Sequence, residues 1–168
     1  SLDEIEELED IVWVDLQNAS EKDEDWIEGH FGLSFQTPQE VIEIESSSRY
    51  IEREQTIIAN SNFLKITTDK MEEAYPVAFQ LKDKTLFTLR TGDSRIFADT
   101  VRKMKISKEQ FHSGADVLLR LFETQIDYEA DLVEGIAKNI TLISRNLNAD
   151  RQTDSNSILV INGLQEQK

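Results

Sequence analysis

The stretch that decides the fold class is IVWVDLQNASEKDEDWIEGHFGL, residues 11–33, in which an apolar strand is followed at once by a capped helix. The run at 11–16 is mostly apolar and predicts a short strand. Ser20, with Asp23 three residues later, has the spacing of a capping box and begins the helix. Gly32 ends that helix, as glycine commonly does at a C-cap. A strand that leads directly into a helix indicates an α/β protein.

Length and composition predict one domain, residues 1–168. Of the 168 residues, 39% are hydrophobic, which is enough for a single core. The absence of cysteine from the sequence excludes disulfides, a thiolate metal site and a cysteine nucleophile, and it favours a cytosolic setting. No apolar run reaches the roughly 18 to 20 residues that span a bilayer, and the N-terminus is too acidic for a signal peptide. We therefore expect the chain to be soluble.

The negative charge is concentrated near the N-terminus. The formal net charge is −15, and residues 1–45 hold 15 acidic side chains but only one base, Lys22. Such a field repels phosphate groups, so nucleic acid and anionic membrane surfaces are not expected partners. An acidic surface attracts cations, although a solvated face that keeps the protein soluble is the alternative interpretation.

A second, short helix is predicted to begin at TPQE, residues 37–40. Thr37 is suited to the N-cap, Pro38 to the first helical position and Glu40 to the acidic position of a capping box. The serines at 46–48 end this helix.

A mixed sheet and a third helix are predicted in the middle of the chain. Lys82-Asp83-Lys84 joins two strand-like runs as a tight hairpin. DSRIFADTVRKMK, residues 93–105, predicts an amphipathic helix with Ile96, Phe97, Val101 and Met104 on its apolar face and a cluster of bases that continues to Lys108. The strand-like runs lie at 50–58, 63–67, 77–81 and 85–90.

The dominant feature is one long helix from Gly114 to Leu147. Its 34 residues correspond to about 50 Å, longer than the roughly 40 Å expected of a domain of this size. We expect its apolar seam to pack within the chain in the first half, and then along a tail helix begun at 156–165 or along a neighbouring subunit. The single domain thus comprises an α/β core at 1–112 and a helical part at 113–168. The seam lies at positions 115, 119, 122, 126, 133, 136, 140, 143 and 147.

The sequence offers little support for enzymatic chemistry. His30 and His112 are far apart in sequence and lack the spacing of zinc ligands. The acids that begin at Asp127 suggest a calcium loop, but its sixth position is Leu132 rather than glycine and its twelfth is Lys138 rather than glutamate. The sequence also lacks a glycine-rich phosphate loop and a GxSxG motif. We predict that the protein is not an enzyme.

Four segments, taken in order, resemble the N-terminal cytoplasmic domain of CorA-type magnesium transporters, in the CorA/ZntB superfamily. WVDLQNASEKDEDWIEGHFGL resembles the opening strand and acidic helix of that family, and PQEVIEIESSSRYIERE resembles its next helix. VAFQLKDKTLFTLRTGDSRIFADTVRKM resembles its paired strands and following helix, and GADVLLRLFETQIDYEADLVEGI resembles its long helix. The shared order of these segments over about 150 residues makes the resemblance fairly specific.

The resemblance implies an α/β/α sandwich, with a mixed sheet flanked by helices and a long helix hairpin. It implies the cytoplasmic part of a homopentameric divalent cation channel, at the cytoplasmic face of the inner membrane. In the family a stalk helix and two transmembrane helices with Gly-Met-Asn between them follow, so the membrane is contacted only through segments absent from this sequence. The fragment alone is expected to be a monomer. The implied ion is Mg²⁺, with Co²⁺, Ni²⁺ and Zn²⁺ as alternatives.

The resemblance also implies a regulatory metal site at Glu40. In the family, Mg²⁺ binds between neighbouring cytoplasmic domains through carboxylates, and Glu40 occupies a matching position. Gln39 stands where members commonly have a second acid, and Ser34-Phe35 replaces the usual His-Pro. A capping role alone would equally explain the glutamate.

A further set of acids on the long helix corresponds to the family's acidic helix near the ion entrance. These residues are expected to concentrate hydrated cations, and the alternative is a solvated helix face. The function hypothesis is an ion-sensing and gating domain whose partners are divalent cations and copies of itself. The alternative is a free-standing acidic module that binds a helical partner through the seam. The acids are Glu123, Asp127, Glu129, Asp131 and Glu134.

Overall fold

The computed structural model describes residues 11–36, 50–53, 56–66, 72–150 and 160–163. By contact density the chain divides into two compact units, Ser1–Gln125 and Ile126–Lys168. The first unit contains the sheet. Among the described residues, no helix combines the length and the apolar character needed to cross a membrane.

The first unit is built on a five-stranded mixed sheet of order β1-β5-β4-β3-β2. β1 is parallel to β5, and every other neighbouring pair is antiparallel. The mixed sheet predicted from the sequence is confirmed. The strands are β1 (Trp13–Gln17), β2 (Tyr50–Arg53), β3 (Thr56–Ile66), β4 (Glu72–Lys82) and β5 (Thr85–Arg90).

The predicted boundaries of the first three strand-like runs are wrong. The run at 50–58 is divided between β2 and β3, and β3 continues through Asn60-Ser61-Asn62 to Ile66. The predicted runs leave a gap at 59–62, but Asn60 is buried in the sheet, where its Nδ2 donates to Gln36 Oε1 at 2.8 Å. A tertiary hydrogen bond therefore accommodates a side chain that local propensity disfavours in a strand.

β4 begins at Glu72, five residues before the predicted start, and it contains Pro76. The first pair between β4 and β5 is Val77 with Arg90, so Pro76 pairs only with β3. Proline is tolerated there because its missing N–H removes no bond on the unpaired side. The tight hairpin between β4 and β5 is confirmed, and Asp83 in its turn has a positive φ of 52°.

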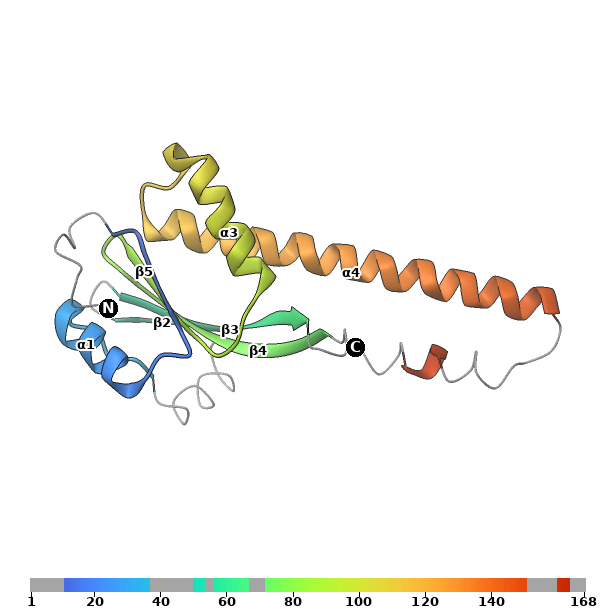
Figure 1. The fold of residues 1–168 in the computed structure, drawn as a ribbon, viewed down its shortest axis with the longest axis horizontal. Helices are drawn as coiled ribbons and strands as arrows, with labels where there is room; N and C mark the ends of the chain where they lie inside the picture. Colours follow the sequence, from blue (N-terminus) through green and yellow to red (C-terminus); the bar gives the residue numbers. More distant parts are fainter. Residues whose placement is uncertain (1–10, 37–49, 54–55, 67–71, 151–159, 164–168) are drawn as a thin grey trace. The chain divides into compact units, whose positions relative to one another are not determined.

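Helices cover both faces of the sheet (Figure 1). α1 (Glu21–Phe31) lies on one face, and α3 (Arg95–Ile106) and the first turns of α4 (Gly114–Asp150) lie on the other. A short 3₁₀ helix, η2 (Lys108–Gln110), connects α3 to α4. The long helix is confirmed, and residues 160–163 of the expected tail helix are helical. The packing of a helix hairpin stays a prediction.

Each face of the sheet has its own apolar core. On the α1 face, Leu16, Ile27, Phe35 and Phe87 form a buried cluster. On the other face, four phenylalanines from two strands and two helices pack with ring centroids 5.5–5.7 Å apart. Burial of one such ring contributes about 1.5–3 kcal/mol, so the aromatic cluster is a major anchor for α3 and α4. Its members are Phe63, Phe79, Phe97 and Phe122.

The ends of α1 follow the sequence prediction. Ser20 and Asp23 form a complete capping box, and Gly32 is the C-cap in the left-handed conformation, with φ 60°. Hydrogen bonds from Ser20 hold the pKa of Asp23 below its usual value. Lys82 Nζ donates to the carbonyl oxygens of Phe31 and Gly32, at 2.8 Å each. It thus satisfies C-terminal carbonyls that lack a partner inside the helix.

The expectation for the first half of the α4 seam is partly wrong. Val117 and Leu121 are completely buried, and Phe122 joins the aromatic cluster. Leu119, by contrast, is 61% exposed, and Ala115 is also exposed. The helix therefore buries a face that is rotated away from the predicted seam, because the large aromatic side chains of the sheet select the residues that fit between them.

Gly114 sets the closest approach between α4 and the hairpin. Its N–H donates to Lys84 O, and a Cβ at this position would lie 2.2 Å from Leu86 N and 2.7 Å from Thr85 C. Only glycine allows this contact. Ser113 and Asp116 form a reciprocal cap at the same point, and the hydrogen bond from Ser113 is the largest cause that lowers the pKa of Asp116.

We predict that Gly114→Ala destabilises the first unit by about 3 kcal/mol, because backbone must move to admit the new methyl group. The matched control is Gly29→Ala in α1, where the new Cβ meets no atom within 4 Å. Since alanine is the better helix former, this control should gain about 0.5–1 kcal/mol. Urea unfolding followed by circular dichroism measures both, and equal stabilities would contradict the proposed close approach.

Candidate functional site

Glu40, the predicted metal ligand, lies outside the described residues, as do Thr37, Pro38 and Gln39. The segment that precedes Glu40 is described as far as Gln36, and hydrogen bonds hold its residues against the sheet and α1. Gln80 Nε2 donates to Ser34 O at 2.7 Å, and Phe35 N donates to a carboxylate oxygen of Glu28. The approach to Glu40 is thus held by specific contacts on the α1 face.

The five acids predicted on the long helix are all exposed. Glu123 belongs to the first unit, and the other four belong to the second. Two of them are paired along the helix: Glu123 with Arg120 at 3.1 Å, and Glu134 with Lys138 at 2.7 Å. Exposed pairs of this kind contribute little to stability, so they leave the carboxylates of Glu123 and Glu134 able to interact with ions in solution.

The spacing of the acids on α4 favours attraction of cations over chelation. Asp127, Asp131 and Glu134 follow one another at intervals of four and three residues and therefore lie along one helix face, whereas Glu129 is rotated away. In the described ranges, no three His, Asp or Glu side chains are grouped so that they could hold a metal ion. An acidic stripe of this kind raises the local concentration of hydrated cations within a Debye length of about 8 Å.

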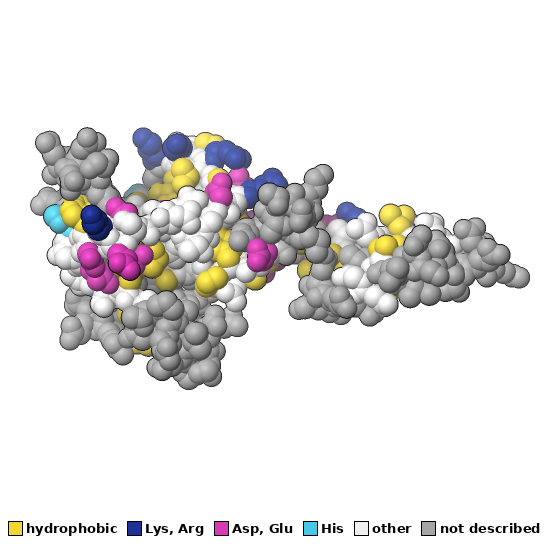
Figure 2. All heavy atoms as spheres, turned by 60° about the horizontal axis from the view of Figure 1, so that its bottom comes forward, with side chains coloured by type: hydrophobic (Ala, Val, Ile, Leu, Met, Phe, Trp, Pro, Cys, Tyr) yellow, Lys and Arg dark blue, Asp and Glu magenta, His cyan; other side chains and the backbone are white. Residues whose placement is uncertain are grey.

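α1 carries a second acidic surface, formed by five acids within eight residues. Figure 2 shows acidic side chains gathered where α1 lies. Burial raises the pKa of Glu24, and the charge of Glu28 raises it further, with smaller contributions from the other acids. A carboxylate in this environment favours a nearby cation. The surface consists of Glu21, Asp23, Glu24, Asp25 and Glu28.

A buried polar network between β1, β5 and α3 was not predicted. Arg90 is 5% exposed, and its Nη2 lies 2.7 Å from Asp15 Oδ2 on the adjacent parallel strand. Its Nε also donates to Asp15 Oδ1 at 3.0 Å, so the pair is bidentate. Thr88 Oγ1 donates to Asp15 Oδ1 at 2.8 Å and accepts from Trp13 Nε1 at 3.0 Å. The carboxylate of Asp15 therefore accepts from two side chains of the adjacent strand β5.

The same network reaches α3 and the loop after β5. The guanidinium carbon of Arg90 lies 4.3 Å from the ring centroid of Phe97, a cation–π contact. Arg90 also donates to Gln17 Oε1 at 3.2 Å and to the carbonyl of Gly92. Nearby, burial raises the pKa of Tyr75, against the opposing effects of its hydrogen bond with Ser94 and of the charge of Arg90. The network thus joins β1, β5, α3 and the loop between them.

Comparison with known proteins identifies the family. A family model described as CorA-like Mg²⁺ transporter protein matches residues 9–167, almost the whole chain. The chain belongs to the CorA-like Mg²⁺ transporter family. The resemblance seen in the sequence is confirmed, and the CorA family is a family of transporters rather than of enzymes.

The matches to individual CorA proteins include only part of the length of those proteins. The magnesium transport protein CorA of Wolinella succinogenes is 34% identical over 133 residues, which are 77% of this chain and 41% of that protein. The magnesium transport protein CorA of Campylobacter jejuni (strain RM1221) is 32% identical over 146 residues, 82% of this chain and 45% of that protein. The chain therefore spans less than half the length of these CorA proteins.

Solved structures share the fold at low sequence identity. The complete structure of the CorA magnesium transporter from Methanocaldococcus jannaschii matches with a TM-score of 0.70 and 12% identity, over 94% of this chain and 50% of that one. The ZntB cytoplasmic domain from Vibrio parahaemolyticus matches with a TM-score of 0.62 and 12% identity, over 92% of this chain and 60% of that one. The sheet and the long helix are thus those of CorA and ZntB soluble domains.

The network around Arg90 left only a weak signal in the sequence. Asp15 interrupts the apolar run IVWVDL. Because a charge taken out of water is unfavourable unless it is paired, an acid within such a strand indicates a cationic partner. Arg90 stands at the end of β5, and 75 residues separate the two. Only the parallel pairing of β1 with β5 brings them together, and that pairing is not encoded locally.

We predict that Arg90→Ala destabilises the first unit by about 2–3 kcal/mol, because it removes a buried guanidinium group and leaves the Asp15 carboxylate, whose side chain is 26% exposed, without its cation. Arg102→Ala on α3 is the control, since Arg102 is exposed and its ion pair within the described ranges is with Asp99, at 3.0 Å. Its effect should stay within about 0.5 kcal/mol. Urea unfolding measures both variants, and an effect of Arg90→Ala no larger than that of the control would show that the network contributes nothing to stability.

Proposed function

We propose that this chain is the ion-sensing, gating domain of a homopentameric CorA-type channel for Mg²⁺, located at the cytoplasmic face of the inner membrane. The observation that carries the proposal is the family match over residues 9–167, in a chain that spans less than half of its CorA relatives. In this proposal the pore lies in a further part of the protein, with a stalk helix and two transmembrane helices. The chain itself senses the ion, and conduction takes place elsewhere.

The sensing step is proposed to use carboxylates between neighbouring subunits, with Glu40 as a ligand. Mg²⁺ prefers oxygen ligands, keeps several waters and is commonly held by one or two carboxylates. It can therefore bridge two acidic surfaces that otherwise repel each other. With a net charge of −15 per chain, removal of the ion would push neighbouring domains apart.

Gating follows if the ion binds one arrangement of the pentamer more tightly than the other. A ligand shifts such an equilibrium only by its difference in affinity, and a change from 1:99 to 99:1 requires about 5.5 kcal/mol. Five equivalent interfaces could share this free energy, so that each contributes about 1 kcal/mol. A weak site that keeps most of its waters is sufficient.

The acids at 123, 127, 129, 131 and 134 are proposed to concentrate cations for transport. Their support is the exposure of all five along α4. Co²⁺, Ni²⁺ and Zn²⁺ would be attracted by the same charges, so this part of the mechanism does not select the ion. We further propose that the domain alone is monomeric, since stalk and membrane helices would supply much of the contact between subunits.

A second candidate function is a free-standing acidic module that binds a helical partner. Its support is the exposure of apolar residues on α4, with Leu119 at 61% and Val133 at 66%. The coding sequence beyond Lys168 distinguishes the two. A long helix followed by two apolar segments of about 20 residues with Gly-Met-Asn between them supports the channel, and an early stop codon supports the module.

In the full-length protein, we expect Glu40→Ala to abolish the dependence of Mg²⁺ flux on the Mg²⁺ concentration at the cytoplasmic side, because the sensing ligand is lost. Flux into liposomes that contain a Mg²⁺-sensitive dye measures this. Glu109→Ala, at an exposed acid of η2, is the control and should retain the dependence. A Glu40→Ala protein that still responds to cytoplasmic Mg²⁺ would limit this residue to helix capping.

Reversal of the five α4 acids to lysine should lower Mg²⁺ flux at low ionic strength by about tenfold, because the field then repels cations. The difference from the wild-type protein should shrink as salt is raised, since screening removes the field. Flux measured over a salt series tests this. If flux depends on salt in the same way in both proteins, the acids form only a solvated helix face and do not concentrate cations.

A further inference from the structure

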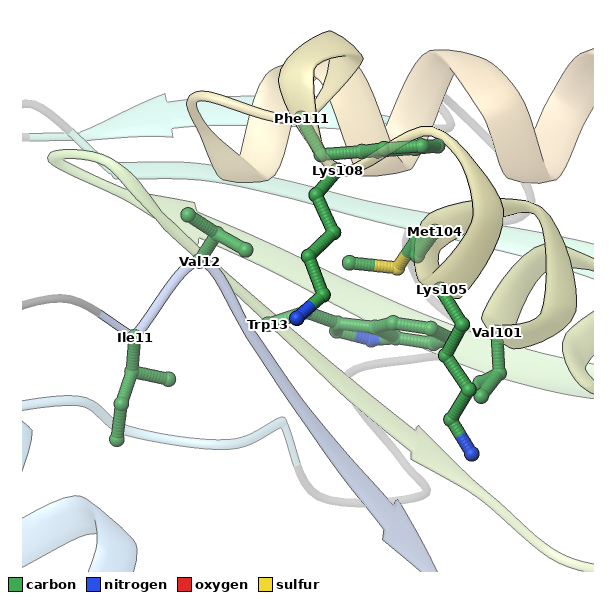
Figure 3. A pocket seen from close by; sticks show the side chains of 8 residues that line it. All are labelled: Ile11, Val12, Trp13, Val101, Met104, Lys105, Lys108 and Phe111. Atoms are coloured by element: carbon green, nitrogen blue, oxygen red, sulfur yellow. The ribbon is translucent and has the colours of Figure 1, made fainter.

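A pocket on the α3 side of the sheet has no part in the proposed ion sensing. It lies where the start of β1 meets the end of α3 and η2, and its volume is about 450 Å³ (Figure 3). Six of its eight lining residues are apolar, and two are lysines. We refer to it as the Trp13 pocket. It is lined by Ile11, Val12, Trp13, Val101, Met104, Lys105, Lys108 and Phe111.

The walls of the Trp13 pocket are fixed by contacts that do not involve a ligand. The carbonyl oxygens of Ile11 and Val12 accept hydrogen bonds from Thr85 Oγ1 at 2.6 Å and from Leu86 N at 2.9 Å. The indole N–H of Trp13 is engaged by Thr88 Oγ1, and the Trp13 ring packs 5.9 Å from that of Phe97. A pre-formed apolar pocket of this size is typical of small-molecule sites.

The polar groups of the pocket are both cationic. Figure 3 shows Lys105 and Lys108 at its rim, with the side chain of Lys108 extending toward Trp13. In the part of the chain that the structure describes, neither ammonium group has a carboxylate partner. The other bases of α3 are engaged, since Arg95 and Arg102 pair with Asp99, and Lys103 bonds to Thr124. Two cations that have no carboxylate partner among the described residues thus lie at the rim of an apolar pocket in an acidic protein.

From this combination we infer that the Trp13 pocket binds a small amphipathic anion, with an apolar body against Trp13 and Met104 and a carboxylate at Lys105 and Lys108. The apolar lining excludes small, fully hydrated anions, which would lose water without compensation. The two ammonium groups exclude cationic amphiphiles. The volume suits a single detached molecule rather than a lipid that remains in a bilayer. This activity is separate from ion sensing and does not depend on it.

The test uses Trp13 itself as the reporter. The sequence has two tryptophans, and the other, Trp26, lies on α1 on the opposite face of the sheet, stacked on His30 with centroids 4.4 Å apart. In a Trp26→Phe background, tryptophan emission therefore comes from the pocket alone. Sodium decanoate is the probe, with 1-decanol, decyltrimethylammonium and acetate as matched compounds. We expect a saturable change in emission with decanoate and none with acetate.

Variants of the pocket separate its charge from its volume. Lys105→Met with Lys108→Met keeps the apolar stems and should weaken decanoate binding about fivefold or more, to the level of 1-decanol. Lys84→Met, at the hairpin turn outside the pocket, should leave it unchanged. Val101 is 38% exposed at the pocket wall, and Val101→Phe should abolish the saturable change by filling the space. Thermal melting checks that each variant is folded.

Several results would overturn the inference. One is the absence of a saturable response to decanoate in the folded protein. Another is equal affinity for decanoate and decyltrimethylammonium, or no effect of the double lysine variant. A change in emission with phosphatidylglycerol vesicles but not with monomeric decanoate would assign the surface to a membrane instead.

Discussion

Arg90 lies beneath α3 with only 5% of its surface exposed, and its guanidinium group is held by Asp15 on the neighbouring parallel strand. An apolar pair of the same shape could be equally stable, because desolvation offsets much of the attraction between buried charges. The pair instead fixes the register of β1. A slip of one residue would move Asp15 to the opposite face, among the apolar side chains that pack against α1. The ion pair therefore adds to the backbone pairing and the apolar contacts that position this edge strand.

β1 is the element through which the two faces of the first unit meet. Val14 and Leu16 pack in the core beneath α1, while Trp13 and Asp15 contribute to the network beneath α3. A displacement of β1 would disturb both faces, because each residue of the strand is packed on one side or the other. The hairpin next to it is in turn held against the start of α4 at Gly114, where no room for a side chain remains. α1, the sheet and the start of α4 are therefore linked in series through β1 and the hairpin.

The parts of the fold that could be predicted from sequence are those encoded by neighbouring residues. Ser20 and Asp23 specify the start of α1, and Gly32 specifies its end, because capping uses backbone groups within a few residues. The strand that contains Asn60 was misplaced because the side-chain amide nitrogen of Asn60 donates to a residue distant in sequence, Gln36. The parallel pairing of β1 with β5, and with it the Arg90 network, rests on residues 75 positions apart.

The same distinction applies to the candidate sites. Charge density alone located the acids of α4, and their exposure agrees with a role in attracting cations, whereas the ligand role of Glu40 depends on a segment outside the described residues. The bases near Lys105 were visible as a cluster, but the pocket that they border requires β1 and α3 to be brought together. Patterns of charge can thus be read from the sequence, while cavities depend on tertiary structure.

The charges of the first unit are separated by the sheet. α1 carries acids with Lys22 as the only lysine or arginine, whereas α3 carries bases with Asp99 as the only acid. Because the two helices cover opposite faces, the charge on α1 is mainly negative and that on α3 mainly positive, and each acts over about the Debye length of 8 Å at physiological ionic strength. A divalent cation and an amphipathic anion would therefore be drawn to different faces of the same sheet. Since β1 contributes to both faces, occupancy of one site can affect the other only if this strand moves, and the Asp15–Arg90 pair opposes that movement. Any coupling between the two ligands is limited by the strength of that ion pair.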